Sequence, residues 1–143
     1  MQVKDVLAHK GAAVATIAPG SPIAEVIALL AQHHVGALVV SSDGRRIEGI
    51  VSERDVVRAL HSRGAALLTT PVGEIMTANV LTCGPGDEIR SLARTMTDRR
   101  FRHMPVEIDG VLSGIVTIGD VVKGRLDELE TEHDQLMGYI SAG

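Results

Sequence analysis

The chain contains the same pattern of residues twice. Residues 14–60 run from Val-Ala-Thr through Pro-Gly and Asp-Gly to Gly-Ile-Val-Ser-Glu-Arg-Asp-Val-Val, and residues 80–126 run from Val-Leu-Thr through Pro-Gly and Asp-Gly to Gly-Ile-Val-Thr-Ile-Gly-Asp-Val-Val. The copies lie 66 positions apart up to the Asp-Gly pairs and 65 after them, so one residue is missing where a hairpin loop tolerates it. Two copies are too few for a solenoid. They predict one compact body built from two pseudo-symmetric halves.

Composition narrows the class of protein. Hydrophobic residues are 45% of the chain, enough for a core, but aromatic residues are 1%, too few for a surface that stacks single-stranded nucleic acid. The net charge of -4 has the wrong sign for a general binder of phosphate backbones. The single cysteine, Cys83, excludes an intramolecular disulfide. No stretch approaches the roughly 20 apolar residues of a membrane span. We therefore expect a cytoplasmic protein that binds neither nucleic acid nor membrane.

Each copy is typical of a strand, a helix, two strands and a second helix, which predicts an α+β fold. An Asp-Gly pair between two apolar runs indicates a tight hairpin turn, because glycine accepts the positive φ that such turns require. Short helices with a shared pattern are expected at residues 3–7 and 72–76, before the first strand of each copy. We place one domain at residues 1–70, with the N-terminal helix, and the other at residues 71–143, with a C-terminal amphipathic helix.

A strand-to-helix junction in each copy carries the side chains that could bind a ligand. A hydroxyl residue ends the strand and an aspartate follows three positions later, as Ser52 with Asp55 and as Thr117 with Asp120. This spacing is that of a helix capping box, although aspartate reaches less far than the glutamate that the box prefers. Free N–H groups at a helix start favour phosphate, and a carboxylate beside them suits a ribose diol. The capping and ligand roles both stay open, since one hydroxyl can serve either.

Together, the motifs resemble a cystathionine-β-synthase (CBS) domain pair, also called a Bateman module, over essentially the full chain. The first copy carries Pro-Gly at 19–20, Val-Gly-Ala-Leu-Val-Val at 35–40 and Gly-Ile-Val-Ser-Glu-Arg-Asp at 49–55. The second carries Glu-Ile-Met-Thr at 74–77, Arg-His-Met-Pro-Val at 102–106 and Gly-Ile-Val-Thr-Ile-Gly-Asp at 114–120. The resemblance is to the small bacterial proteins that consist of the pair alone. It implies tandem CBS domains packed with pseudo-two-fold symmetry, which dimerise through their helices into a flat disc.

That family binds adenine nucleotides (AMP, ADP, ATP or NAD(H)), and in some members S-adenosylmethionine, in clefts between the two halves. By resemblance, Asp120 would hold the ribose hydroxyls and Thr117 a phosphate or ribose oxygen. Arg102 and His103 are similar to the basic pair that meets phosphate in the family. We expect these four residues to form the tighter of two unequal clefts.

The first copy offers the matching positions without the basic pair. Ser52 and Asp55 would be the counterparts of Thr117 and Asp120 in the other cleft. Gly36 and Ala37 occupy the positions of the basic pair, where small side chains would leave room for a base but supply no charge.

Several other charged residues and the single cysteine could also have a role in binding or in the core. Arg54, inside the first junction motif, is either a phosphate contact or a solvated arginine at a helix start, and Lys10 is a weaker candidate of the same kind. The remaining arginines of residues 94–102 are expected at a solvated helix end. Cys83 is predicted to be a buried structural thiol. No nucleophile, base and orienting group come together in the sequence, so we predict no enzyme, no metal site and no required cofactor.

The C-terminal end carries an apolar seam. Its members recur at intervals of four and three residues: Val122, Leu126, Leu129, His133, Leu136 and Ile140. A seam of fewer than three heptads is too short to be stable alone. It therefore predicts either a helix packed on its own core or a dimer contact, and the sequence favours neither.

These features predict a non-catalytic regulatory module, most simply a homodimer, that binds an adenine nucleotide and signals energy or redox state to an unidentified partner. Two alternatives stay open: a constitutive dimeric scaffold with vacant clefts, and a sensor of S-adenosylmethionine.

Overall fold

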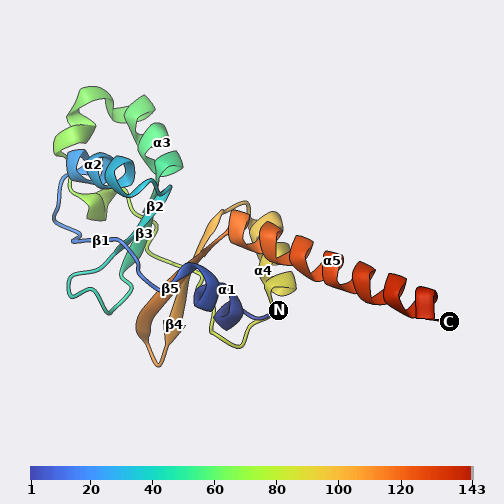
Figure 1. Cartoon of the computed structure of the whole chain (residues 1–143). Helices are drawn as coiled ribbons and strands as arrows, with labels where there is room; N and C mark the ends of the chain where they lie inside the picture. The colour runs from blue at the N-terminus through green and yellow to red at the C-terminus, as the bar shows by residue number, and fades with distance from the viewer. Residues whose placement is uncertain (143) are drawn as a thin grey trace.

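Two halves lie side by side, and a long C-terminal helix extends away from the second (Figure 1). The computed structural model describes residues 1–142. The first half contains β1 (Thr16–Ile17), α2 (Ile23–His33), β2 (Ala37–Val40), β3 (Gly49–Ser52) and α3 (Glu53–Arg63). The second contains α4 (Ile89–Arg99), β4 (His103–Ile108), β5 (Val111–Thr117) and α5 (Ile118–Ala142). Helix α1 (Val3–Lys10) comes first, and two 3-10 helices, η1 (Gly64–Thr69) and η2 (Val72–Glu74), connect the halves. The predicted α+β fold of tandem units is confirmed.

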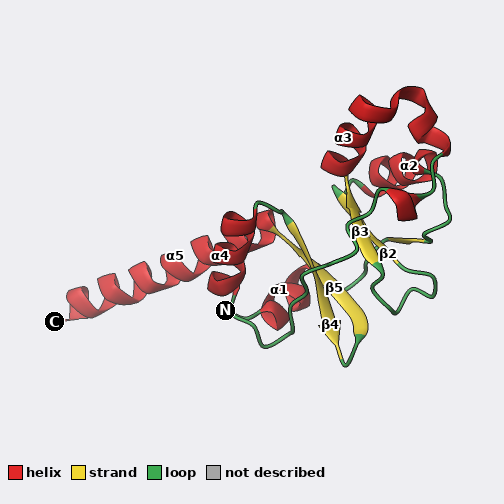
Figure 2. Ribbon diagram, turned by 180° about the vertical axis from the view of Figure 1, so that it is seen from behind, coloured by secondary structure: helices red, strands yellow, loops and turns green. Residues whose placement is uncertain are grey.

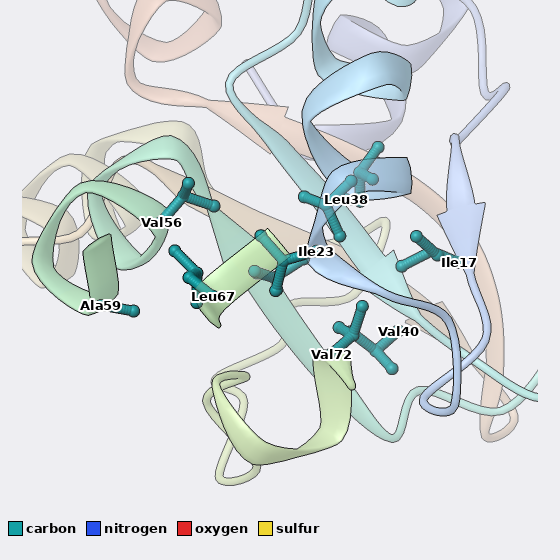
Figure 3. Packing of buried hydrophobic residues seen from close by; sticks show 10 residues of the cluster. Ile17, Ile23, Leu38, Val40, Val56, Ala59, Leu67 and Val72 are labelled. Carbon is teal, nitrogen blue, oxygen red and sulfur yellow. The ribbon is translucent and has the colours of Figure 1, made fainter. Parts of the chain in front are cut away.

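The first half is a three-stranded sheet packed under its helices. β2 is the central strand, parallel to β1 and antiparallel to β3. All four residues of β2 are buried, as expected for a central strand with both faces covered. Figure 3 shows Leu38 and Val40 of this strand among the side chains of the core. The core holds only aliphatic side chains, namely Ile17, Ile23, Val26, Leu38, Val40, Val51, Val56, Ala59, Leu67 and Val72.

The run Val-Leu-Thr-Cys at residues 80–83 is expected to form the first strand of the second copy, but the structure has only a single parallel bridge at Cys83 there. In the first half, the Val39 N–H donates to the Ala15 carbonyl across 3.3 Å. The residue equivalent to Val39 is Pro105, which has no N–H to donate. The second sheet is therefore reduced to the antiparallel pair β4–β5 (Figure 2).

Each half completes its core with a segment from across the predicted boundary at residue 70. We expected the N-terminal helix within residues 1–70, but Val3 and Leu7 of α1 pack into the core of the second half. In return, Val72 belongs to the core of the first half, and Ile75 and Met76 pack against it. Figure 2 shows α1 beside β5, away from the first sheet.

Backbone hydrogen bonds hold the exchanged segments in the same way in both halves. The Val3 N–H donates to the Asp87 carbonyl across 2.9 Å, and the equivalent Val72 N–H donates to Ser21 across 2.8 Å. The next residues repeat the match, since the Lys4 N–H donates to the Pro85 carbonyl and the Gly73 N–H to Pro19. The exchange is thus a property of the repeat, and it joins the two halves at two places.

Two equivalent glycines make room for the exchanged segments. A Cβ at Gly114 of β5 would lie 2.8 Å from Leu7 Cδ2, and a Cβ at Gly49 of β3 would lie 2.5 Å from Met76 Sδ. Both distances are shorter than real carbon contacts allow. The glycines therefore let α1 and the segment after η2 approach the strands closely.

Helix α5 packs on its own chain only near its start. Val121 and Gly124 are buried. Farther along, Leu126, Leu129, Leu136 and Ile140 are 50–60% exposed. The distal part of the predicted seam therefore does not pack on the core of its own chain. No helix within residues 1–142 has the length and apolar character needed to span a membrane.

The thiol of Cys83 is buried in the core of the second half, as predicted. Burial, with a smaller effect from the charge of Asp87, raises the pKa of Cys83 to about 12. The thiolate is therefore scarce at neutral pH, and the side chain serves packing.

Gly114→Val should destabilise the fold by about 1–3 kcal/mol, the usual cost of overpacking. Valine suits a strand, so the loss would come from its contact with Leu7. Urea unfolding measures the effect, and Gly86→Val, at a glycine with open space around it, is the control. Adding Leu7→Ala should cost less in the Gly114→Val background than in wild type. Strictly additive losses would show that the two residues do not compete for space.

Candidate functional site

Both strand-to-helix junctions form complete capping boxes. The Ser52 N–H donates to Asp55 Oδ2 across 2.9 Å, and the Asp55 N–H donates to Ser52 Oγ across 3.3 Å. In the second half, the Thr117 N–H donates to Asp120 Oδ2 across 2.9 Å, and the Asp120 N–H donates to Thr117 Oγ1 across 3.1 Å. The expectation that aspartate is poorly suited to this box is wrong. The cap residue Ser52 has an extended backbone (φ -113, ψ 163), which brings its N–H within reach of the shorter side chain.

The carboxylate of Asp55 keeps capacity for a ligand. Its Oδ2 accepts all the bonds of the cap, including one from the Ser52 hydroxyl across 3.0 Å. Its Oδ1 accepts no hydrogen bond from the described residues 1–142. Oδ1 of Asp55, beside the start of α3, is therefore free to accept a hydrogen bond from a ligand.

A cavity of about 350 Å³ lies between the two halves at the first junction. This volume falls within the range of small-molecule sites. Residues of both halves line it: Gly36, Ile50, Ser52, Glu53, Arg54, Asp55, Arg58, Thr77, Asn79, Val80, Leu81, Arg99, Arg100, Phe101, Arg102 and His103. The cavity thus depends on how the halves pack.

The cavity wall has three chemically distinct parts. Ser52 and Asp55 supply a hydroxyl and a carboxylate. An apolar part is contributed by Ile50, Val80, Leu81 and Phe101. The third part consists of five arginines, namely Arg54, Arg58, Arg99, Arg100 and Arg102.

His103 reaches across the interface between the halves. Its ring lies 3.2 Å from where a Cβ would stand on Gly36, and the Glu53 carboxylate is 3.3 Å from the same point. Gly36 therefore makes room for the imidazole. Burial lowers the pKa of His103, Glu53 partly opposes that shift, and the positive charges of Lys10 and Arg102 add to it. The ring is consequently neutral at pH 7.

The second junction is arranged differently, because its carboxylate already has a cationic partner. Lys10 Nζ lies 2.6 Å from Asp120 Oδ2, with side chains 30% and 21% exposed. Burial of Asp120 acts to raise its pKa, but the Lys10 ammonium and the Thr117 N–H outweigh burial and lower it. Neither Thr117 nor Asp120 lines the cavity.

The cavity therefore contains only part of the predicted grouping, since Arg102 and His103 line it whereas Thr117 and Asp120 do not. His103 does pair with Thr117 through the β4–β5 backbone. Its side chain, however, points to the facing half, so that the basic pair lines the cavity of Ser52 and Asp55. The sequence places residues along a strand but does not show which half their side chains face.

The other candidates divide between the two junctions. Arg54 lines the cavity, as its phosphate-contact hypothesis requires, whereas Lys10 lies at the second junction. Gly36 lines the cavity. Ala37 does not, because it is buried in β2, where it pairs with Ser52.

Sequence reasoning missed several residues of the cavity wall. Arg58 follows Arg54 by four positions on α3, a spacing that places both on one face of the helix and could have indicated it. Arg99 and Arg100 are exposed, as predicted for a solvated helix end, but they also border the cavity. Nothing in the sequence pattern around Phe101 indicated a place in a cavity wall, although it is the single phenylalanine of the chain.

Comparisons with known proteins agree on one family. The family model described as CBS domain matches residues 3–62 and 72–127. The mitochondrial CBS domain-containing protein CBSX3 of Arabidopsis thaliana is 37% identical over 123 residues, which are 83% of this chain but only 60% of that protein. The crystal structure of a CBS-domain containing protein from Agrobacterium tumefaciens is 45% identical with a TM-score of 0.84, and the match covers 87% of this chain and 99% of that one.

Two similar solved structures contain adenosine compounds. A CBS domain protein from Pyrobaculum aerophilum is complexed with AMP, with 28% identity, a TM-score of 0.74 and coverage of 84% of this chain and 89% of that one. The CBS domain pair of protein MJ0100 is in complex with 5′-methylthioadenosine and S-adenosyl-L-methionine. It is 25% identical, with a TM-score of 0.74 and coverage of 90% of this chain and 98% of that one.

Lys10→Met should reduce stability at neutral pH by about 0.5–1 kcal/mol, as for other partly exposed ion pairs. The pKa of Asp120 is lower in the folded protein than its usual 3.8. The stabilisation by the pair is therefore complete above the unfolded pKa and is lost as the pH falls through the folded pKa. Urea unfolding of wild type and variant should show a gap that is constant well above the unfolded pKa and narrows as the pH falls below it.

The control for this experiment is Lys4→Met, on the same helix but exposed. It should change stability little in either pH range. A gap between wild type and Lys10→Met that persists unchanged at low pH would contradict the ion pair.

Proposed function

This chain belongs to the CBS domain family, and we propose that it is a non-catalytic regulatory module that binds an adenine nucleotide in the cavity between its halves. One observation carries the proposal. The cavity combines a hydroxyl–carboxylate pair, an apolar wall and arginines, which match the ribose, base and phosphate of a nucleotide.

Each part of the ligand has a partner in this arrangement. The free Oδ1 of Asp55 accepts from a ribose hydroxyl, and Ser52 lies beside it. Val80 and Phe101 flank the base, and Arg54 and Arg102 meet the phosphate with charge-assisted hydrogen bonds. The open junction at Asp55 is preferred over the one at Asp120, whose carboxylate is paired with Lys10.

The alternative ligand, S-adenosylmethionine, is disfavoured by charge. The similar structures contain AMP in one case and methylthioadenosine with S-adenosylmethionine in another, which supports adenosine compounds in general. A sulfonium is positive, and the five arginines of this cavity would repel it.

The scaffold alternative predicts that no adenine nucleotide raises the melting temperature.

Binding would be transmitted by linkage. A ligand that contacts both halves stabilises their closed arrangement by its differential affinity for that state. At a hundredfold excess over its Kd, the gain is about 2.7 kcal/mol, enough to shift a balanced equilibrium. The module would report energy or redox state to a separate protein in the cytoplasm.

Asp55→Asn should raise the Kd for AMP by about ten- to a hundredfold, because a hydrogen bond to a charged group contributes about 1.5–3 kcal/mol. The amide oxygen can still accept from the Ser52 N–H, so that the cap survives. Isothermal titration calorimetry measures the change. Asp120→Asn is the matched control at the equivalent cap, and it should leave the Kd for AMP within about twofold. Wild-type affinity in Asp55→Asn, or an equal loss in both variants, would contradict the assignment of the cavity.

We further propose that the distal part of α5 is a homodimer contact. Leu129, Leu136 and Ile140 expose half or more of their surface, which is costly in water for residues at helical spacing on one face. A second copy of α5 would bury them.

Leu129→Glu with Leu136→Glu should dissociate this dimer, since paired carboxylates cannot be buried without a partner. Analytical ultracentrifugation should show wild type at twice the monomer mass and the variant as monomer. Glu132→Gln, on the same helix outside the seam, should leave the mass unchanged. A monomeric wild type would refute the contact.

A further inference from the structure

The cavity holds a concentration of positive charge that contrasts with the rest of the chain. Five of the eleven arginines in the sequence line it, although the chain as a whole has a net charge of -4. The acidic residues in its wall are Glu53 and Asp55. Since His103 is neutral, the wall has an excess of three positive charges.

None of these five arginines forms an ion pair with a carboxylate among the described residues. The ion pairs among residues 1–142 involve Lys10, Arg63, Arg125 and the N-terminal amine, but no arginine of the cavity. Asp55 is engaged in the cap of α3. Like charges gathered without counter-charges repel one another, so a bound anion would relieve this repulsion.

The arginines approach the cavity from both halves. Arg54 and Arg58 lie on α3, whereas Arg99, Arg100 and Arg102 lie between the end of α4 and the start of β4 (Figure 1). A single phosphate group has three terminal oxygens, which are too few for bidentate contacts with five guanidinium groups. Five arginines on facing walls therefore exceed what a monophosphate uses.

We propose that this cavity selects nucleotides with a polyphosphate chain, of two phosphates or more, over monophosphates. AMP brings a charge of about −2, which leaves the wall positive, whereas a diphosphate brings about −3 and a triphosphate about −4, so that either offsets the whole excess. The inference rests on the proposed function for the base and ribose, but the phosphate selection stands on the arginines alone. Arg58, Arg99 and Arg100 would be the residues that set the preference.

Arg100 permits a test in which folding and binding change in opposite directions. It ends α4 in the left-handed region, with φ 58, where glycine is the preferred residue. The equivalent residue of the first half, His34, ends α2 with φ 53 and does not line the cavity. Arg100→Gly and His34→Gly should therefore both maintain or raise the melting temperature, and only Arg100→Gly removes a charge from the cavity.

The experiment titrates AMP, ADP, ATP and inorganic tripolyphosphate, without Mg²⁺, into wild type and both variants by calorimetry. Wild type should bind ATP at least about tenfold more tightly than AMP. Raising NaCl from about 50 to about 200 mM should weaken ATP more than AMP. Arg100→Gly should weaken ATP about five- to tenfold and AMP less than about twofold, and His34→Gly should change neither.

The four probes distinguish the polyphosphate preference from the proposed binding of an adenine nucleotide. AMP binding as tightly as ATP would overturn it and leave the proposed adenine function standing. Equal effects of the two glycine variants on ATP would also overturn it, because the charge of Arg100 would then be irrelevant. Tripolyphosphate binding with no adenine nucleotide binding would support the charge selection and refute the proposed function. Absence of binding by all four probes would refute both.

Discussion

The hydrogen bonds between each capping aspartate and the residue that ends the preceding strand determine most of what this molecule can do. At Ser52–Asp55 and Thr117–Asp120 they turn a strand into a helix and satisfy N–H groups that would otherwise have no partner. They also hold the carboxylate of each aspartate in place at its junction. Only one of its two oxygens accepts the hydrogen bonds of the cap, so the other oxygen stays available. Loss of such a cap costs about 1 kcal/mol. A residue at this place therefore serves folding and can still accept a further hydrogen bond through its second oxygen.

The two junctions share this geometry and differ in their surroundings. Asp120 has Lys10 at 2.6 Å, whereas Asp55 faces a cavity with an apolar wall and five arginines. His103 contributes to the difference, since its neutral ring fills the space beside Gly36. The repeat thus provides two equivalent backbones, and a few side chains decide that one is open and the other is occupied by the protein itself.

The repeat, the order of elements and the junction residues could be predicted from sequence, because hydrophobic period and capping spacing are local properties. The loss of the strand at residues 80–83 depended on one N–H missing from Pro105, which matters only after the strands are paired. The placement of Arg102 and His103 could not be predicted, because side-chain direction across an interface depends on how the halves pack. The same is true of Arg99 and Arg100, which are exposed yet border the cavity.

The exchange of α1 for residues 72–76 bears on how such a chain could arise. Each repeat carries one such segment, which covers the strand glycine of the other repeat, so two separate copies could exchange these segments as in a domain-swapped dimer. Gene fusion of two such copies replaces a concentration-dependent association with a tethered one of high effective concentration. After fusion the copies need no longer be identical, so mutation can open the surroundings of one junction and close those of the other.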